Sequence, residues 1–252
     1  MKTKIAVLLL ACSLSGFAQK RKLVWSEEFN GKTLNEKVWN FELGDGCPNI
    51  CGWGNNEKQL YTRDNHELRD GKLVINVTKK DDKFYSTRIT TASKKEFKYG
   101  RMEARAKVPT AVGTWPAFWM LGANIKQVGW PKCGEIDILE YVGRAPGEVF
   151  TSLHTQSSHG NTINTKISKI AGIDKGFHDY AIEWNEESIA FFVDGNYVYT
   201  YNPAVKNEDT WPYNQPFYFI LNVAVGGNFG GPSIDEAAFP QTFEIDYIRV
   251  YQ

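Results

Sequence analysis

The amino-acid sequence predicts an all-β protein, built as a sandwich of two sheets or as a barrel. Short segments with the two-residue alternation of β-strands recur along the chain, and turns rich in glycine and proline separate them. No segment keeps a 3.6-residue apolar period, which an amphipathic helix would require. The 252 residues and the apolar fraction of 42% allow one large core, so a single domain is the simplest organisation.

The alternation is cleanest over residues 99–108, where charged and small apolar side chains take turns. Asp194-Gly195 predicts a tight hairpin turn, and only a short turn of helix fits residues 235–238. Further strands are predicted at residues 73–78, 114–121, 135–142, 149–154, 179–184, 189–193, 197–201, 217–225 and 243–251.

The N-terminus has the pattern of a secretory signal peptide. Lys2 and Lys4 precede an apolar stretch over residues 5–11, and small residues lead to a cleavage site after Ala18. We therefore expect residues 1–18 to be removed, leaving residues 19–252 as a single domain that is secreted or periplasmic. A lipoprotein signal ending at Cys12 is the alternative, but Leu10 fits that signal poorly and the tether would be short.

Three cysteines remain in the exported chain. Cys47 and Cys51 lie in a glycine-rich loop, where they form a disulfide in an oxidising compartment or stay as free thiols. Half of a zinc site is disfavoured, because no second pair of cysteine or histidine residues has ligand spacing. Cys133 is expected to be a small buried residue.

Charge and hydropathy exclude several classes of partner. The chain has 29 Lys+Arg and 29 Asp+Glu, so its formal net charge at pH 7 is zero. This balance argues against a nucleic-acid or anionic membrane partner held mainly by charge. No apolar run reaches the roughly 20 residues that span a bilayer. The aromatic content of 14% indicates either a β-rich core or stacking surfaces.

An acidic strand is the most informative segment. Alternation places Glu135 and Asp137 on one face of the strand, with Ile136 and Ile138 in the core. A β-bulge at residues 138–139 would return Glu140 to the carboxylate face. The Cα atoms of Glu135 and Glu140 would then lie roughly 13 Å apart. Side chains leaning inward on a concave sheet could bring the carboxyls to the about 5–5.5 Å of a retaining glycosidase.

Two simpler interpretations of this strand stay open. The carboxylates could form an exposed acidic face that pairs with Arg101 and Lys107. A transition-metal site is weaker, because no clustered histidines accompany the carboxylates in the sequence.

Several motifs, in order along the chain, resemble the family 16 glycoside hydrolases, and specifically their bacterial laminarinase (endo-β-1,3-glucanase) branch. Glu135-Ile-Asp-Ile-Leu-Glu140 is similar to the bulged acidic motif of that family, whereas lichenase-type members lack a residue at the Leu139 position. The resemblance covers nearly the whole mature chain; its other segments are 25–31, 52–57, 99–105, 113–121, 221–228 and 243–251.

The resemblance implies a β-jelly-roll sandwich of two antiparallel sheets with a concave substrate cleft. It also implies retaining hydrolysis of internal β-1,3-glucosidic bonds, with Glu135 as nucleophile and Glu140 as general acid/base. Asp137 would tune the nucleophile. These roles agree with the chemistry, since the nucleophile must be ionised and neighbouring negative charge raises the pKa of the acid. No cofactor is expected for catalysis.

Aromatic side chains can stack on the apolar faces of sugar rings. Trp115, Trp119 and Trp130 adjoin the acidic strand in the family pattern, and the even spacing of Trp115 and Trp119 puts both on one face of a strand. Each could instead be a core residue, which is the interpretation preferred for Trp39 and Trp184.

Family position also nominates polar partners for sugar hydroxyls. Asn55, Arg101 and Asn222 are the candidates, with turn or sheet roles as the alternative. His154, on the strand after the acidic one, is also nominated as a substrate-binding residue. It could approach Glu140 or could be a structural histidine.

Members of the family commonly hold one structural calcium ion away from the cleft. The best matches for its ligands are Glu28, the backbone carbonyl of Gly71 and Asp246, which offer the oxygen atoms that calcium prefers. The alternative is that the two carboxylates face solvent.

The expected partner is a β-glucan polysaccharide, and the chain is expected to be a monomer. Mixed-linkage β-1,3-1,4-glucan stays open as a substrate. A non-catalytic glucan-binding protein is disfavoured because both Glu135 and Glu140 are present. Sulfated galactans are disfavoured because no Lys/Arg cluster accompanies the motifs.

Overall fold

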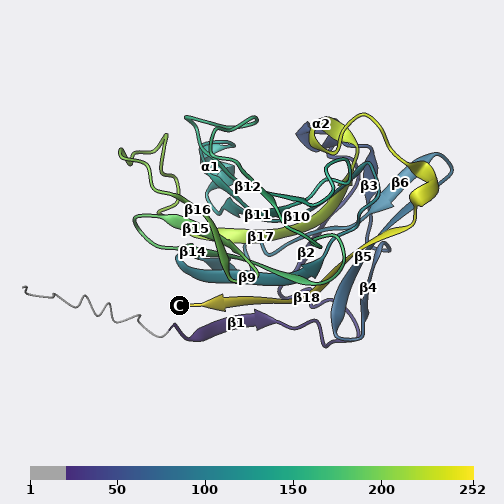
Figure 1. The fold of residues 1–252 in the computed structure, drawn as a ribbon, viewed down its shortest axis with the longest axis horizontal. Coiled ribbons are helices and arrows are strands. Elements are labelled where there is room, and N and C mark those ends of the chain that lie inside the picture. Colours follow the sequence, from purple (N-terminus) through teal and green to yellow (C-terminus); the bar gives the residue numbers. More distant parts are fainter. Residues whose placement is uncertain (1–20) are drawn as a thin grey trace, which may run out of the picture.

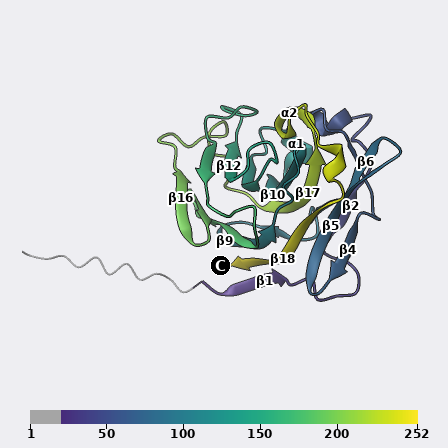
Figure 2. The ribbon, with the colours of Figure 1, turned by 45° about the vertical axis from the view of Figure 1, so that its right-hand side comes forward.

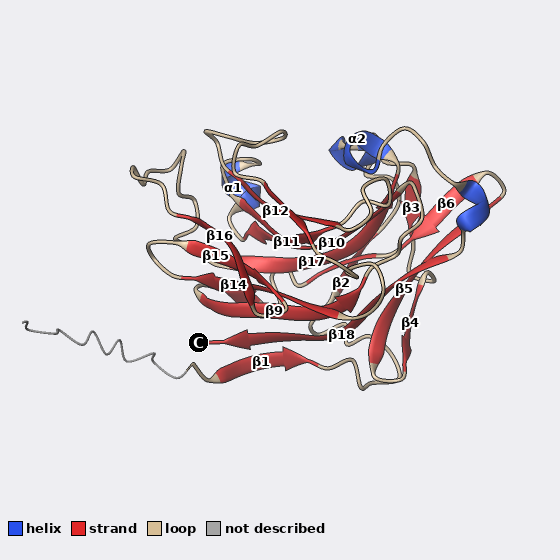
Figure 3. Ribbon diagram, in the orientation of Figure 1, coloured by secondary structure: helices blue, strands red, loops and turns tan. Residues whose placement is uncertain are grey.

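The computed structural model describes residues 21–252 as two β-sheets packed face to face (Figure 1; Figure 3). All strand pairs are antiparallel except β3 with β6. The jelly-roll sandwich predicted from the sequence is therefore confirmed. The predicted signal peptide, including Cys12, lies outside the described residues.

One sheet has ten strands in the order β16-β15-β14-β9-β18-β5-β6-β3, with β1 beside β18 and β4 beside β5. Its strands are β1 (Leu23–Glu27), β3 (Gln59–Tyr61), β4 (His66–Arg69), β5 (Lys72–Lys80), β6 (Lys83–Ser86), β9 (Gly100–Lys107), β14 (His178–Trp184), β15 (Ile189–Val193), β16 (Asn196–Tyr201) and β18 (Gln241–Tyr251).

The other sheet has eight strands in the order β13-β12-β11-β10-β17-β7-β2, with β8 beside β17. Its strands are β2 (Asn40–Glu42), β7 (Arg88–Thr90), β8 (Glu96–Phe97), β10 (Thr114–Gly122), β11 (Glu135–Glu140), β12 (Glu148–His154), β13 (Lys166–Lys169) and β17 (Phe217–Val225). The acidic strand β11 is an inner strand of this sheet, between β10 and β12.

Helical structure in the described residues is limited to single turns in the loops. These are η1 (Cys51–Gly54), α1 (Ile125–Val128), α2 (Gly227–Gly230) and η2 (Glu236–Ala238). In Figure 1 and in the turned view of Figure 2, α1 and α2 lie on the same side of the eight-stranded sheet. Across residues 21–252, no helix is long and apolar enough to cross a membrane.

The core lies between the sheets and follows from the alternation of each strand. In β9, Met102, Ala104 and Ala106 are fully buried, whereas the charged residues between them are not. Strand β17 is buried along its whole length. Its Phe219 lies at the centre of the sandwich, where it contacts the rings of Trp25 and Phe118.

Most of the predicted strands are confirmed within one or two residues, and the turn at Asp194-Gly195 joins β15 to β16 with both residues at positive φ. Trp39 and Trp184 are core residues, as predicted. The prediction missed β1–β4, β6–β8 and β13. Each of these strands has only two to five residues, which is too short to show a period.

Candidate active site

Strand β11 contains the predicted β-bulge. Asp137 lies opposite Trp119 of β10, but the next pair along is Leu139 with Phe118, so Ile138 has no partner on β10. The pairing with β12 shifts in the same interval. The extra residue lets both Ile138 and Leu139 point into the core while Glu140 returns to the face of Glu135.

Trp130 and His154 surround the carboxylate of Glu135. Trp130 Nε1 donates a hydrogen bond to Glu135 Oε2 at 2.7 Å. On the other side, His154 Nε2 lies 3.6 Å from Glu135 Oε1. The Trp130 side chain is 47% exposed and its ring packs edge-on against His159. An exposed indole held by a carboxylate offers a free face for a ligand.

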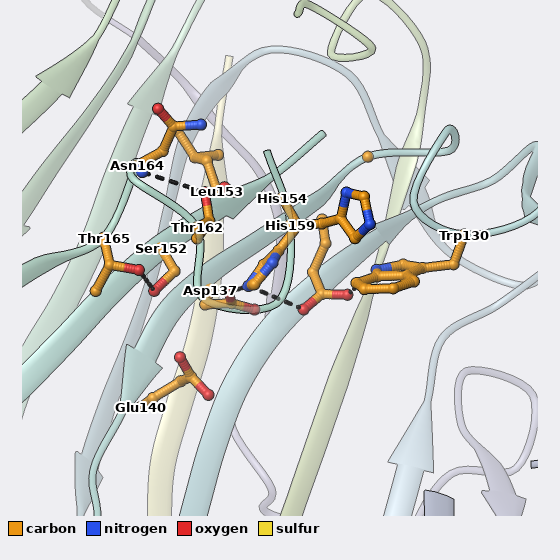
Figure 4. A network of polar contacts seen from close by, with 12 residues as sticks. Trp130, Asp137, Glu140, Ser152, Leu153, His154, His159, Thr162, Asn164 and Thr165 are labelled. Carbon is orange, nitrogen blue, oxygen red and sulfur yellow. Dashed lines mark hydrogen bonds and ion pairs between the residues drawn. The ribbon is translucent and has the colours of Figure 1, made fainter. Parts of the chain in front are cut away.

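Asp137 is the most deeply buried of the three carboxylates, at 3% exposed. Its Oδ2 lies 3.1 Å from His154 Nε2, and Figure 4 shows the two side chains meeting beneath His159. Burial disfavours the charged imidazole, but the negative charges of Asp137, Glu135 and Glu140 outweigh it and raise the pKa of His154 to about 9.

Glu140 has a different environment from Glu135. Its Oε1 accepts one hydrogen bond, from Trp115 Nε1 at 2.9 Å. The Trp115 ring packs edge-on against Phe229 from the α2 turn, and Phe229 also packs against Phe150. These aromatic side chains form an apolar wall beside Glu140.

Both glutamates have raised pKa values, for the same two main reasons. Burial disfavours each carboxylate, and the negative charge of Asp137 adds to this, so the pKa of Glu135 rises to about 8 and that of Glu140 rises well above its usual value. His154 and one indole N–H oppose the shift at each glutamate. The pair therefore retains a proton in a range where an exposed glutamate has lost it.

Glu135, Asp137 and His154 bring ligand-type atoms within 4.8 Å of one another, a pattern that could also hold a cation. The sequence lacked a histidine near the carboxylates, and the pairing of β12 with β11 supplies one. Without a metal ion, a protonated imidazole gives the carboxylates their positive partner.

A second polar group continues along the same face, toward η1. Trp119 Nε1 donates to Asn222 Oδ1 at 2.8 Å, and Asn222 Nδ2 donates to the hydroxyl of Tyr61 at 3.0 Å. The Tyr61 hydroxyl donates to Glu57 at 3.3 Å, and Asn55 Nδ2 donates to the other oxygen of Glu57 at 3.3 Å. The structure thus joins three nominated residues, Trp119, Asn222 and Asn55, in one network.

The sequence prediction missed Glu57, Tyr61, Trp53 and Arg88 of this network. The guanidinium of Arg88 lies between two indoles, 4.6 Å from the Trp53 ring centroid and 4.9 Å from that of Trp119. Arg88 also forms an ion pair with Glu42. The sequence did contain a signal for Glu57 and Tyr61. With Gln59 they occupy every second position after the Gly-Trp-Gly-Asn motif, which would put all three on one face of a strand. Arg88 lies in a three-residue strand, which gives no period.

The nomination of Arg101 as a substrate contact is wrong. Arg101 belongs to β9, in the ten-stranded sheet, and its neighbours Met102 and Ala104 point into the core. Its own side chain therefore points away from the sandwich, where it pairs with Glu103 at 2.8 Å and Glu183 at 3.5 Å. Alternation showed that this face is polar but could not show to which sheet the strand belongs.

The residues nominated for calcium do not present free ligands. Both oxygens of Glu28 accept hydrogen bonds from Arg249, each at 2.9 Å. Asp246 lies 3.7 Å from Arg105 Nε. Because each carboxylate already faces a guanidinium, the set does not fit a calcium ion in this arrangement.

The two loop cysteines are joined by a disulfide, and Cys133 is a buried free thiol. The Cys47–Cys51 ring lies in the loop that carries Trp53. Within that loop Trp53 Nε1 donates to the carbonyl of Gly44 at 3.2 Å. The disulfide ring therefore lies in the loop that positions Trp53 beside the second polar group.

Residues 54–249 match the glycosyl hydrolases family 16. A crystal structure of laminarinase from Flavobacterium sp. UMI-01 is 66% identical, covers 92% of this chain and 100% of that chain, and superposes with a TM-score of 0.91. The beta-glucanase of Rhodothermus marinus is 36% identical over 97% of this chain and 92% of its own length.

The glucan endo-1,3-beta-glucosidase A1 of Niallia circulans is 38% identical over 91% of this chain. This chain spans only 38% of the length of that protein, whereas it spans nearly all of the Rhodothermus marinus one. The family match and these identities agree with the bulged acidic strand and its neighbouring tryptophans. This chain belongs to family 16 of the glycosyl hydrolases.

Proposed function

We propose that the chain is an endo-β-1,3-glucanase that cleaves laminarin-type β-glucans with retention of anomeric configuration. The Flavobacterium relative is named a laminarinase and the Niallia circulans relative an endo-1,3-beta-glucosidase, which supports this substrate class. Hydrolysis by a pair of carboxyl groups uses no cofactor.

In the proposed reaction Glu135 is the nucleophile and Glu140 the general acid/base. The Glu135 carboxylate attacks the anomeric carbon while Glu140 donates its proton to the leaving glycosidic oxygen. This step forms a glycosyl ester on Glu135. Glu140 then takes a proton from water, whose oxygen attacks the anomeric carbon and releases Glu135.

The unequal surroundings of the two glutamates carry this assignment. Glu135 accepts a hydrogen bond from Trp130 and faces the imidazole of His154, both of which favour its ionised form. Glu140 accepts one hydrogen bond, from Trp115, and burial with the charge of Asp137 raises its pKa well above the usual value, so its protonated form is favoured more strongly. A nucleophile must be ionised and an acid protonated, so the proton that the pair shares belongs on Glu140.

The glucan is proposed to bind along the face of β10, β11 and β17. Trp130, Trp115 and Trp119 would stack on sugar rings, and Asn222 and Asn55 would bind hydroxyl groups. These groups follow one another along one face of the eight-stranded sheet, which suits a chain of sugar residues rather than a single one.

The test is hydrolysis of laminarin, curdlan, barley β-glucan, lichenan and agarose by the wild type, Glu135→Gln and Glu140→Gln. We expect the wild type to release oligosaccharides from laminarin and curdlan, and each variant to lose activity by at least about 10⁴-fold. A wild type that prefers barley β-glucan or lichenan would indicate a mixed-linkage enzyme. Binding of laminarin without any hydrolysis by the wild type would indicate a binding protein.

Rescue by azide distinguishes the two roles. With an activated aryl glucoside, Glu140→Ala still forms the glycosyl ester, and azide then displaces Glu135 to give a β-glycosyl azide. Glu135→Ala lacks the nucleophile, so azide attacks from that side and gives the α-glycosyl azide. The opposite pairing of products would reverse the assignment.

We further propose that residues 19–252 form one exported, monomeric catalytic domain, released after cleavage at Ala18. Mass spectrometry of the secreted protein and size-exclusion chromatography test both points.

A structural calcium ion at Glu28, Gly71 and Asp246 stays a prediction from the family and would need Arg249 to move away. An unchanged melting temperature in a chelator would exclude it.

A further inference from the structure

His154 is the one cationic group in the described residues that lies within ion-pair distance of Glu135 and Asp137. Strand pairing places it opposite Glu135, and its Nε2 lies 3.1 Å from Asp137 Oδ2 and 3.6 Å from Glu135 Oε1. No lysine or arginine forms an ion pair with Glu135, Asp137 or Glu140 among residues 21–252. The His154 side chain is 11% exposed, so solvent screens this pairing little.

The burial of Asp137 requires a positive partner. Its Oδ2 is buried and, within residues 21–252, accepts no hydrogen bond of good geometry. A buried carboxylate oxygen without donors is costly unless a charge compensates it, and the imidazole of His154 is the group in reach. Asp137 and a charged His154 therefore stabilise each other.

The backbone on both sides of this pair is held in place. The buried hydroxyl of Tyr213 donates to the carbonyl oxygen of His154 at 3.0 Å and lies 3.3 Å from that of Glu135. One side chain from the loop before β17 thus fixes the end of β12 against the start of β11. The distance from His154 to Glu135 is set by two strands rather than by a flexible loop.

We propose that His154 is a positioning residue of the reaction, whose imidazolium neutralises Asp137 and holds Glu135 ionised and oriented for attack on the anomeric carbon. This inference rests on the proposed function of Glu135. It revises the expectation that His154 contacts the substrate or Glu140, because its Nε2 is directed at Asp137 and Glu135.

The other titratable groups around the site stay neutral in the working range. Burial, with the charge of Glu135, raises the pKa of the Cys133 thiol to about 12, and burial raises the pKa of the Tyr213 hydroxyl well above its usual value. The shifted pKa values of Glu135, Glu140 and His154 are therefore the ones that bear on the pH profile of this site. A change in the pH profile after substitution of His154 reports on the carboxylates.

The first experiment tests the charge of His154 without any assay of activity. The chain has four histidines, so ¹⁵N-labelled imidazole signals can be followed by NMR as pH rises from 5 to 10. We expect a signal of a protonated imidazole at pH 8 that is missing in His154→Gln. If His154→Gln does not fold, substitution of His66, His159 and His178 assigns the signal by elimination. A neutral His154 at pH 7 would overturn the proposal.

The second experiment is the pH dependence of kcat/KM for laminarin. In His154→Gln, which keeps a hydrogen-bond donor but not the charge, we expect kcat/KM near pH 6 to fall at least about 10-fold. The acidic limb should move to higher pH by about 1 unit, because Glu135 loses a neighbouring positive charge. KM should change little, since His154 is not proposed to touch the glucan.

His178→Gln is the matched control. His178 also pairs with a carboxylate, Asp194 at 2.7 Å, but it lies on β14 of the other sheet. Its profile should match that of the wild type. A His154→Gln profile that keeps the wild-type limbs, with only kcat lowered, would leave His154 a structural role and refute the inference. Loss of the proposed function itself would instead appear as a wild type that hydrolyses none of the glucans.

Discussion

Asp137 lies between two glutamates that need opposite protonation states in the proposed reaction. After burial, its negative charge is the largest influence on the pKa of both Glu135 and Glu140, ahead of the opposing charge of His154. In Asp137→Asn both glutamates should therefore lose their protons at lower pH. We expect both limbs of the kcat/KM profile to move to lower pH, by up to about 1 unit. Limbs that stay in place would show that Asp137 acts only by hydrogen bonding.

Trp130 is the most exposed of the three nominated tryptophans, and it also donates to Glu135. Trp130→Ala should remove both a sugar-stacking face and one donor that favours the ionised nucleophile. We expect kcat/KM for laminarin to fall at least about 10-fold with little change in melting temperature, because the side chain is not in the core. Trp130→Phe separates the two effects, since it keeps the stacking face but not the N–H. Unchanged kinetics of a folded Trp130→Ala would remove Trp130 from the site.

At the scale of elements, the bulge in β11 decides which side chains face the substrate. A regular strand would have turned Glu140 into the core, since strict alternation puts Leu139 beside Asp137. The extra residue shifts the alternation by one position, so that Glu140 faces the same side as Glu135. It also places two side chains, Ile138 and Leu139, in the core where a regular strand would place one. The same shift occurs against both neighbouring strands, which makes it a property of β11 itself.

The loop before β3 depends on the Cys47–Cys51 disulfide. Its ring precedes Trp53, whose indole covers the Arg88 guanidinium beside Trp119. Cys47→Ser with Cys51→Ser should lose about 2 kcal/mol of unfolding free energy, or about 4–8 °C in Tm. KM for laminarin should also rise as Trp53 and Arg88 lose their fixed positions.

The control for this loop is reduction of the wild type. A thiol reductant should lower the Tm of the wild type by the same amount and leave that of the double variant unchanged. A wild type that does not respond to reduction, while its thiols titrate as free, would show that the ring does not stabilise the loop.

For the whole molecule, the buried Glu135 is expected to lower the free energy of unfolding as pH rises toward 8. A glutamate whose pKa is raised from 4.5 to about 8 on folding contributes stability below its unfolded pKa, and that contribution is lost as pH rises toward 8. Glutamine does not titrate. The Tm of Glu135→Gln minus that of the wild type should therefore become more positive between pH 4.5 and pH 8.

The exposed Glu208 provides the comparison for this measurement. The difference in Tm between Glu208→Gln and the wild type, measured at each pH, gives the baseline for removing an exposed glutamate. If the difference for Glu135→Gln follows this baseline, burial and Asp137 do not raise the pKa of Glu135 in the folded chain.

The sequence by itself determined the longer strands, the bulge and the shared face of Glu135, Asp137 and Glu140. Each of these follows from local alternation, which covalent geometry imposes wherever a strand is half buried. The even spacing of Trp115 and Trp119 belongs to the same class. Both side chains lie on the face of the acidic residues, since each donates to a polar group there.

Only the tertiary structure decided which strands are neighbours. Alternation gives the face of a strand but not its sheet, so Arg101 was placed at the site although β9 belongs to the other sheet. Pairing of β11 with β12 brought His154 to Asp137, and pairing of β17 with β7 brought Arg88 beside Asn222. The charge of the site depends on these long-range contacts, because burial and neighbouring charges, not residue type, set the pKa values of its carboxylates.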